Sequence, residues 1–155
     1  REALILKALL NHPWLVEDNC ELLAALPFTS KSGERLRDAL LDLQAGEVPL
    51  DSEGLRAQLT QLGLDRIIAQ IEQSSSHRGD RFAEPGSDRA LVEAGWMHAV
   101  RLHESQVGLR RALDAAEKAW LAEPNEDTLA RITEIKRLLL QPVDAGDGSE
   151  ATPSR

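Results

Sequence analysis

The longest proline-free stretch of this chain, residues 86–123, constrains the fold more than any other sequence feature. Ser87 is a favourable N-cap residue, and Asp88 follows in the first turn, where the helix dipole favours an acidic side chain. The stretch therefore predicts one long helix, in which Gly95 and Gly108 are the weak points where a bend could occur. About 35 helical residues span roughly 50 Å, which exceeds the diameter of a small domain. Such a helix is expected to leave its own bundle or to connect two of them.

A second, shorter helix is predicted to return alongside the first. Pro124 cannot continue a helix, and Asn125 is a suitable N-cap for the next one. Each of the two helices carries a stripe with a spacing of three and four residues, which is typical of a seam between helices. The stripes are Leu102, Gln106, Leu109, Leu113, Ala116 and Trp120 in the first helix, and Leu129, Ile132, Ile135 and Leu139 in the second. Residues 87–140 therefore predict a protruding antiparallel helical hairpin; the alternative is a long helix that folds back on its own bundle.

Residues 1–73 predict a bundle of four or five short amphipathic helices, separated by proline and glycine residues that end each apolar pattern. The predicted segments are residues 3–10, 14–26, 30–46, 51–63 and 65–73. Residues 74–86 are rich in turn-forming residues and predict a linker, whereas residues 141–155 have almost no apolar content and predict a disordered tail. The predicted fold is all-α: a helical bundle joined by a long helix to a protruding helical hairpin.

The composition limits the classes of function. The net charge is −8 and there is no tyrosine, which disfavours tight duplex-DNA binding and leaves few aromatic platforms for nucleic-acid bases. No apolar run reaches membrane-spanning length, no signal peptide is visible, and the single cysteine, Cys20, cannot form an internal disulfide. These features predict a cytoplasmic protein that binds another protein. Because helical periodicity begins at Arg1 without a preceding Met, we also expect a piece of a longer protein.

No catalytic, metal-binding or cofactor-binding constellation is recognisable in the sequence. His103 and Glu104 begin like the zinc-protease motif HExxH, but Val107 stands where the second histidine ligand is required. A glycine-rich phosphate-binding loop and a glycine-flanked serine nucleophile are also missing from the sequence. We therefore expect a fragment that is not an enzyme by itself and that needs no metal and no cofactor.

Several segments together resemble one bacterial family. They are REALILKALLNHP at residues 1–13, LRDALL at 36–41, Trp96, RLHE at 101–104 and LDAAEKAW at 113–120. This pattern is similar to the C-terminal helicase-binding domain of bacterial DNA primase, in its proteobacterial form and nearest to the alphaproteobacterial type. The likeness covers almost all of residues 1–140 and depends on many scattered positions.

The resemblance implies a protein-interaction domain of the primosome. In that family the domain carries no polymerase chemistry, since the nucleotidyltransferase that makes RNA primers lies elsewhere in the primase chain. Its hairpin docks on the N-terminal collar of the hexameric replicative helicase, and its bundle modulates the helicase during DNA replication. Some relatives also bind single-stranded-DNA-binding protein. In other relatives the extreme C-terminus contributes to docking, a role that the polar tail of this chain makes doubtful.

The predicted partner-binding residues lie at the end of the first hairpin helix and along the second. Leu138 is the first candidate for the helicase contact, because it is about 120° from Ile132 on a helical wheel, away from the centre of the seam, and basic side chains lie near it. Trp120 is the next candidate. The full predicted set is Trp120, Arg131, Ile135, Lys136, Leu138, Leu139 and Leu140. Two alternatives remain open: the N-terminal domain of the replicative helicase itself, which has a similar bundle and hairpin, and a generic helical adaptor.

Overall fold

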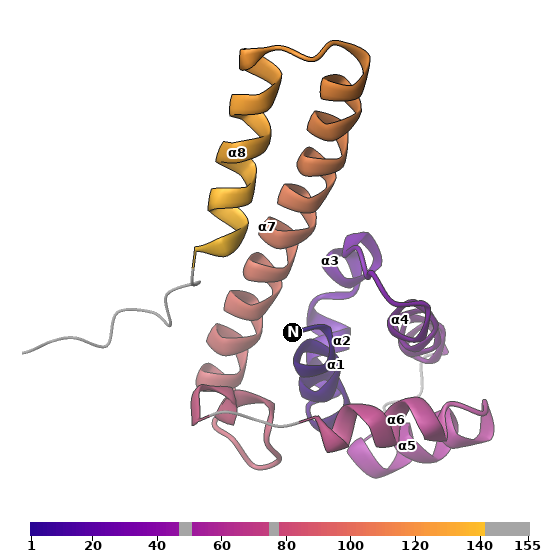
Figure 1. The fold of residues 1–155 in the computed structure, drawn as a ribbon. Coiled ribbons are helices and arrows are strands. Elements are labelled where there is room, and N and C mark those ends of the chain that lie inside the picture. Colours follow the sequence, from indigo (N-terminus) through magenta and orange to yellow (C-terminus); the bar gives the residue numbers. More distant parts are fainter. Residues whose placement is uncertain (47–50, 75–77, 142–155) are drawn as a thin grey trace, which may run out of the picture. The chain divides into compact units, whose positions relative to one another are not determined.

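The computed structural model describes residues 1–46, 51–74 and 78–141 of the chain. These residues form eight α-helices, one 3-10 helix and no strand, so the predicted all-α fold class is confirmed (Figure 1). The chain divides into two compact units, residues 1–104 and 105–155. Each unit is described by itself below, and the predicted tail, residues 142–155, lies outside the described residues.

Short helices make up most of the first unit. They are α1 (Glu2–Asn11), α2 (Trp14–Asp18), α3 (Cys20–Ala25), α4 (Lys31–Ala45), α5 (Ser52–Gln61), α6 (Asp65–Gln73) and the 3-10 helix η1 (Arg78–Ala83). The first part of the long helix α7 (Arg89–Ala122) completes the unit. The predicted helices of the bundle are therefore all present, with one division that the sequence pattern did not reveal.

That division falls at Asn19, where the single predicted helix over residues 14–26 becomes α2 and α3. The Asn19 side chain amide donates to the Leu15 carbonyl at 3.0 Å, and the Leu23 N–H donates to the Asn19 carbonyl at 2.9 Å. A side chain that bonds to nearby backbone competes with the helical pattern, which explains the break.

Side-chain caps fix where two of the bundle helices begin. The Ser30 hydroxyl accepts the N–H of Gly33 at 3.0 Å, and the Asp51 carboxylate accepts the N–H of Gly54 at 2.7 Å. Each bond satisfies one of the backbone donors that a helix N-terminus leaves without a partner. Gly63, with a φ of 77°, ends the turn after α5 in the left-handed region that glycine adopts without strain. These positions confirm the predicted boundaries.

Helix α1 is the centre of the first unit. Four of its side chains, Ile5, Ala8, Leu9 and Leu10, are completely buried, because α2, α4, α5, α6 and η1 all contact this helix. Leu23, Leu36, Leu59 and Trp96 bring further helices into the same apolar core. An apolar helix surrounded on most sides is typical of the inner helix of a bundle.

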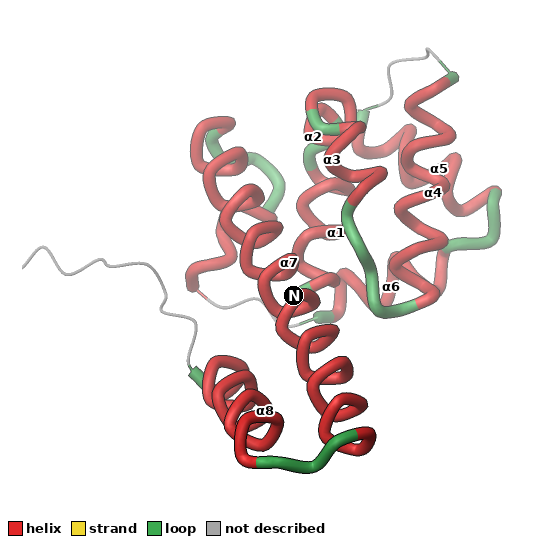
Figure 2. The backbone as a smooth tube through the Cα atoms, turned by 90° about the horizontal axis from the view of Figure 1, so that it is seen from above, coloured by secondary structure: helices red, strands yellow, loops and turns green. Residues whose placement is uncertain are grey.

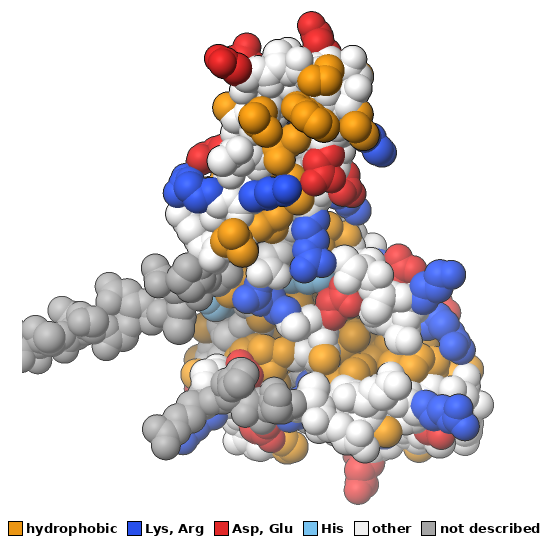
Figure 3. Space-filling view, viewed as in Figure 1, with side chains coloured by type: hydrophobic (Ala, Val, Ile, Leu, Met, Phe, Trp, Pro, Cys, Tyr) orange, Lys and Arg blue, Asp and Glu red, His pale blue; other side chains and the backbone are white. Residues whose placement is uncertain are grey.

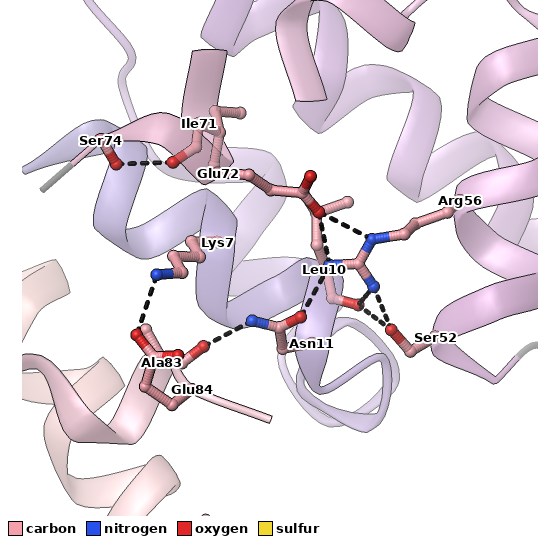
Figure 4. Close-up of polar contacts among 10 residues, drawn as sticks. All are labelled: Lys7, Leu10, Asn11, Ser52, Arg56, Ile71, Glu72, Ser74, Ala83 and Glu84. Carbon is pink, nitrogen blue, oxygen red and sulfur yellow. Dashed lines mark hydrogen bonds and ion pairs between the residues drawn. The ribbon is translucent and has the colours of Figure 1, made fainter. Parts of the chain in front are cut away.

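The predicted linker over residues 74–86 is corrected by the structure, which builds its described part into the first unit. Phe82 and Ala83 are buried in the core. Asn11 donates to the Ala83 carbonyl at 2.7 Å, and Lys7 forms an ion pair with Glu84 at 2.9 Å (Figure 4). Polar composition alone suggested a solvated loop here, whereas the single aromatic residue anchors the segment to the core.

The long helix α7 also differs from the prediction, because its first part belongs to the bundle. Val92 and Trp96 are completely buried in the core of the first unit, and the boundary between units falls after Glu104. The predicted division into residues 1–73 and 87–140 is therefore corrected to a boundary inside α7. The helix begins at Arg89, and Ser87 does not act as its side-chain cap but donates its hydroxyl to the Arg81 carbonyl at 2.6 Å.

None of the described helices combines the length and the low charge needed to cross a membrane.

Candidate protein-interaction surface

The second unit is a helical hairpin, made from the C-terminal part of α7 and from α8 (Glu126–Leu140). Figures 1 and 2 both show the two helices side by side and joined by a short turn. At this turn the Asn125 side chain accepts the Thr128 N–H at 2.9 Å, while the Thr128 hydroxyl accepts the Asn125 N–H at 3.1 Å. This reciprocal capping box fixes the start of α8, as predicted from Pro124 and Asn125.

The seam between the two helices is small. Ala116, Ile132 and Ile135 are buried, and Ala112, Leu113 and Leu139 pack against them in part. The predicted seam residues Ile132, Ile135 and Leu139 are therefore confirmed. Leu129, which was predicted to join them, is instead 53% exposed. Since Ile135 and Leu139 face α7, we correct the predicted partner-binding set by leaving these two residues out of the exposed surface.

Three exposed apolar side chains gather where α7 ends and α8 begins. Trp120 is 37% exposed, Leu121 is 73% exposed and Leu129 is 53% exposed; we call these three residues the tip cluster. Figure 3 shows hydrophobic side chains gathered on this end of the hairpin. Exposed clusters of large apolar side chains are common at sites where proteins bind other molecules, so the tip cluster is the candidate interaction surface.

Helix geometry places the tip cluster on one face of the hairpin. At about 100° per residue, Trp120 and Leu121 are displaced by roughly 40° and 140° from Ala116, and Leu129 by roughly 60° from Ile132, all in the same rotational sense. In an antiparallel pair, residues displaced in the same sense on both helices lie on the same face. Lys136 and Leu140, displaced by roughly 40° and 80° from Ile132, share this face, and Leu140 is 83% exposed.

The opposite face carries the other predicted partner-binding residues. Leu138 is 37% exposed, and Arg131 beside it is exposed as well. Farther round the same helix, Arg137 forms an ion pair with Glu134 at 2.6 Å. The hydrogen bond from Arg137 lowers the pKa of the Glu134 carboxyl, and the same bond raises the pKa of Arg137. The predicted set is therefore divided between two faces and the seam.

Sequence reasoning missed Leu121 and Leu129 as surface residues. Leu129 fits the three-four spacing of the seam, so periodicity alone cannot distinguish it from the buried residues Ile132 and Ile135. Its position in the first turn of α8 was the available signal. At the end of the hairpin where the turn joins the two helices, no further turn of either helix is present to cover such a side chain.

The polar network around Arg56 in the first unit has a structural role. Arg56 donates to Glu72 at 3.0 Å and to the Asn11 side chain at 2.7 Å, and it also bonds to the Ser52 hydroxyl (Figure 4). A fourth, longer contact of the guanidinium reaches the Leu10 carbonyl at 3.5 Å. The guanidinium therefore joins α1, α5 and α6, and its donors already have partners within the bundle.

The described residues contain no group of three or more His, Cys, Asp and Glu side chains placed to hold a metal ion. His103 is buried, and its Nε2 lies 2.6 Å from the Pro27 carbonyl. This histidine therefore joins α7 to the loop before α4. Comparison with protein-family models, with curated proteins and with solved structures gives no match to this chain.

Proposed function

We propose that this chain is a helicase-binding domain of the bacterial DNA primase type. In this proposal the hairpin docks a primase onto the N-terminal collar of the hexameric replicative helicase and modulates the helicase during primer synthesis. The resemblance of residues 1–13 and 113–120 to that family supports the partner's identity. The domain needs no cofactor for this role and acts in the cytoplasm, with single-stranded-DNA-binding protein as a further partner.

The tip cluster is the observation that carries the proposal. A hairpin that buries only Ala116, Ile132 and Ile135 stabilises itself weakly, yet it exposes a tryptophan and two leucines beside that seam. Burying a large apolar side chain contributes roughly 1.5–3 kcal/mol, so this cluster alone can supply a substantial part of a binding energy. Tryptophan is among the residues that most often dominate interface energetics.

The direct test is a titration of the complete chain with the replicative helicase hexamer of the same organism, by calorimetry or by pull-down. Trp120→Ala and Leu129→Ala are expected to weaken binding at least tenfold without lowering helical content. Leu138→Ala is the matched control, because Leu138 and Trp120 are equally exposed, at 37%, on opposite faces. A loss with Leu138→Ala alone would move the contact to the face that carries Arg131. No binding by the parent chain would refute the proposed function.

Two other functions make different predictions. If the chain is the N-terminal domain of the helicase itself, the complete protein continues into an ATPase region after Arg155. A primase instead has a zinc-binding and polymerase region before Arg1. A generic helical adaptor would not bind the helicase hexamer in the titration. It would still use the tip cluster to bind its own partner.

A further inference from the structure

We propose that the chain also pairs with a second copy of itself, through the face of the hairpin that carries the tip cluster. The two hairpins would form an antiparallel four-helix bundle, in which α7 lies over α7 of the other copy and α8 over α8. This inference concerns the second unit alone, and it does not depend on the proposed function. It follows from the distribution of charge and of exposed apolar side chains along the two helices.

The charges on this face have opposite signs at its two ends. At about 100° per residue, Glu117 and Arg110 are displaced from Ala116 by roughly 100° and 120°, in the same sense as Trp120. Glu117 lies nearer to the turn, and Arg110 lies about two helical turns before it, roughly 10 Å away along the axis. On α8, Glu126 at the turn and Lys136 near the far end repeat the same polarity. The face is therefore acidic toward the turn and basic away from it.

Among the residues that the structure describes, Glu117, Arg110, Glu126 and Lys136 have no partner. None of them takes part in any ion pair or side-chain hydrogen bond among the residues that the structure describes. Arg110, Glu126 and Lys136 are exposed, and Glu117 is half-buried. By contrast, Glu134 and Arg137 on the outer side of α8 form an ion pair with each other at 2.6 Å.

A two-fold axis that lies in the plane of the interface, at right angles to the helix axes, makes this face complementary to itself. The axis reverses one copy, so that Glu117 of each copy lies toward Arg110 of the other, and Glu126 lies toward Lys136, within the range that long side chains can cover. In such an isologous interface every contact occurs twice. A parallel arrangement would instead bring the acidic ends together and the basic ends together, which like-charge repulsion opposes. The charge pattern therefore selects the antiparallel pairing.

The apolar side chains of the face fit the same arrangement. Trp120 of one copy would lie opposite residue 107 of the other, about one helical turn from Arg110, so that the guanidinium can reach its indole. The chain already uses this pairing in its first unit, where the Arg89 guanidinium lies 4.2 Å from the centre of the Trp14 ring. Leu140 of one copy would in turn approach the tip of the other, where Leu121 is exposed.

The test is sedimentation equilibrium of the complete 155-residue chain over a range of concentrations. The parent is expected to form a dimer as concentration rises. Arg110→Glu and Glu117→Lys, each made alone, are expected to weaken dimerisation at least tenfold, because each change places like charges together at two symmetric positions. Arg131→Glu on the opposite face is the matched control and is expected to leave dimerisation unchanged.

Mixing the two single variants distinguishes this specific antiparallel dimer from non-specific association. In an antiparallel heterodimer, the new glutamate of one chain meets the new lysine of the other, and the native Glu117 of the first meets the native Arg110 of the second. The mixture, and the double variant R110E/E117K, are therefore expected to recover parental dimerisation. A parent that stays monomeric at every concentration, or single variants that the mixture does not rescue, would overturn the proposal. Helical content measured on each variant shows that the fold is retained.

Discussion

The ring of Phe82 lies directly against the backbone of Gly95. A Cβ added at Gly95 would meet the Cγ and Cδ1 atoms of Phe82 at 2.5 Å, a distance that real Cβ atoms essentially never show. Gly95 was predicted from sequence as a weak point of the long helix, but α7 continues through it. The glycine is needed because it allows η1 to approach α7 closely enough to bury Phe82.

Gly95→Ala is therefore expected to destabilise the first unit. The added methyl group must displace a buried ring in a packed core, which costs roughly 1–3 kcal/mol of unfolding free energy. Chemical denaturation followed by circular dichroism measures this change. Gly108→Ala is the control on the same helix, because nothing lies within 4 Å of its added Cβ. It should raise helix stability by up to about 1 kcal/mol, and equal effects of the two substitutions would contradict the packing argument.

Glu2 is expected to make the stability of the first unit depend on acid pH. Burial acts to raise the pKa of Glu2, but hydrogen bonds from the Thr29 N–H, the Thr29 hydroxyl and the Ser30 hydroxyl outweigh burial, and the nearby His103 adds to them, so that the pKa is lowered. A carboxyl with a lowered folded pKa contributes stability above its unfolded pKa and loses this contribution as the pH falls through the folded value. The unfolded value is about 4.5.

The measurement compares the parent with Glu2→Gln by thermal denaturation between neutral pH and pH 3. The variant should be less stable at neutral pH, and the difference should shrink as the pH falls below about 4.5. A difference in melting temperature that is constant over this range would show that the ionised carboxylate is not what stabilises the contact.

Arg56→Ala is expected to loosen the junction of α1, α5 and α6. Without the guanidinium, the Asn11 side-chain carbonyl loses its donor inside the bundle, while the Leu10 carbonyl keeps the Ser52 hydroxyl at 3.0 Å. A polar group left without a partner in the bundle costs roughly 1–3 kcal/mol. Arg56→Lys should recover little of this loss, since an ammonium group cannot reproduce the planar fork. Full recovery by lysine in urea denaturation would show that only the positive charge matters.

Ile132→Ala is expected to open the hairpin, because Ile132 is one of the three buried seam residues. Truncation of a buried isoleucine costs roughly 2–5 kcal/mol, which is large compared with so small a seam. Hydrogen exchange of the α8 amides measures the local opening. Leu129→Ala, at the exposed end of the same helix, should leave the exchange rates nearly unchanged. Faster exchange in both variants would place Leu129 in the seam after all.

Local signals predicted most helix ends of this fold. Ser30, Asp51 and Asn125 are side-chain caps that act over three residues, so their effect can be read from a short window of sequence. The contact of Phe82 with Gly95 is different, since it depends on the packing of a 3-10 helix against another helix. For the same reason the boundary between the units was predicted too early in the chain.

The candidate surface was only partly predictable. Trp120 was identified because a tryptophan near a helix end has little core to fill, and its exposure agrees with that reasoning. Ile135 and Leu129 both fit the periodicity of the seam, yet one is buried and the other exposed. Spacing defines the face of a helix, but burial also depends on how far the partner helix extends beside it.

The placement of the tryptophans gives each compact unit its own optical reporter. The chain has three tryptophans and no tyrosine, and Trp120 is the single tryptophan after residue 104. Trp96 is completely buried, whereas Trp120 is 37% exposed, so their emission spectra differ in wavelength. Replacing Trp14 and Trp96 with phenylalanine leaves a chain whose intrinsic fluorescence comes from the end of the hairpin alone, without any attached dye.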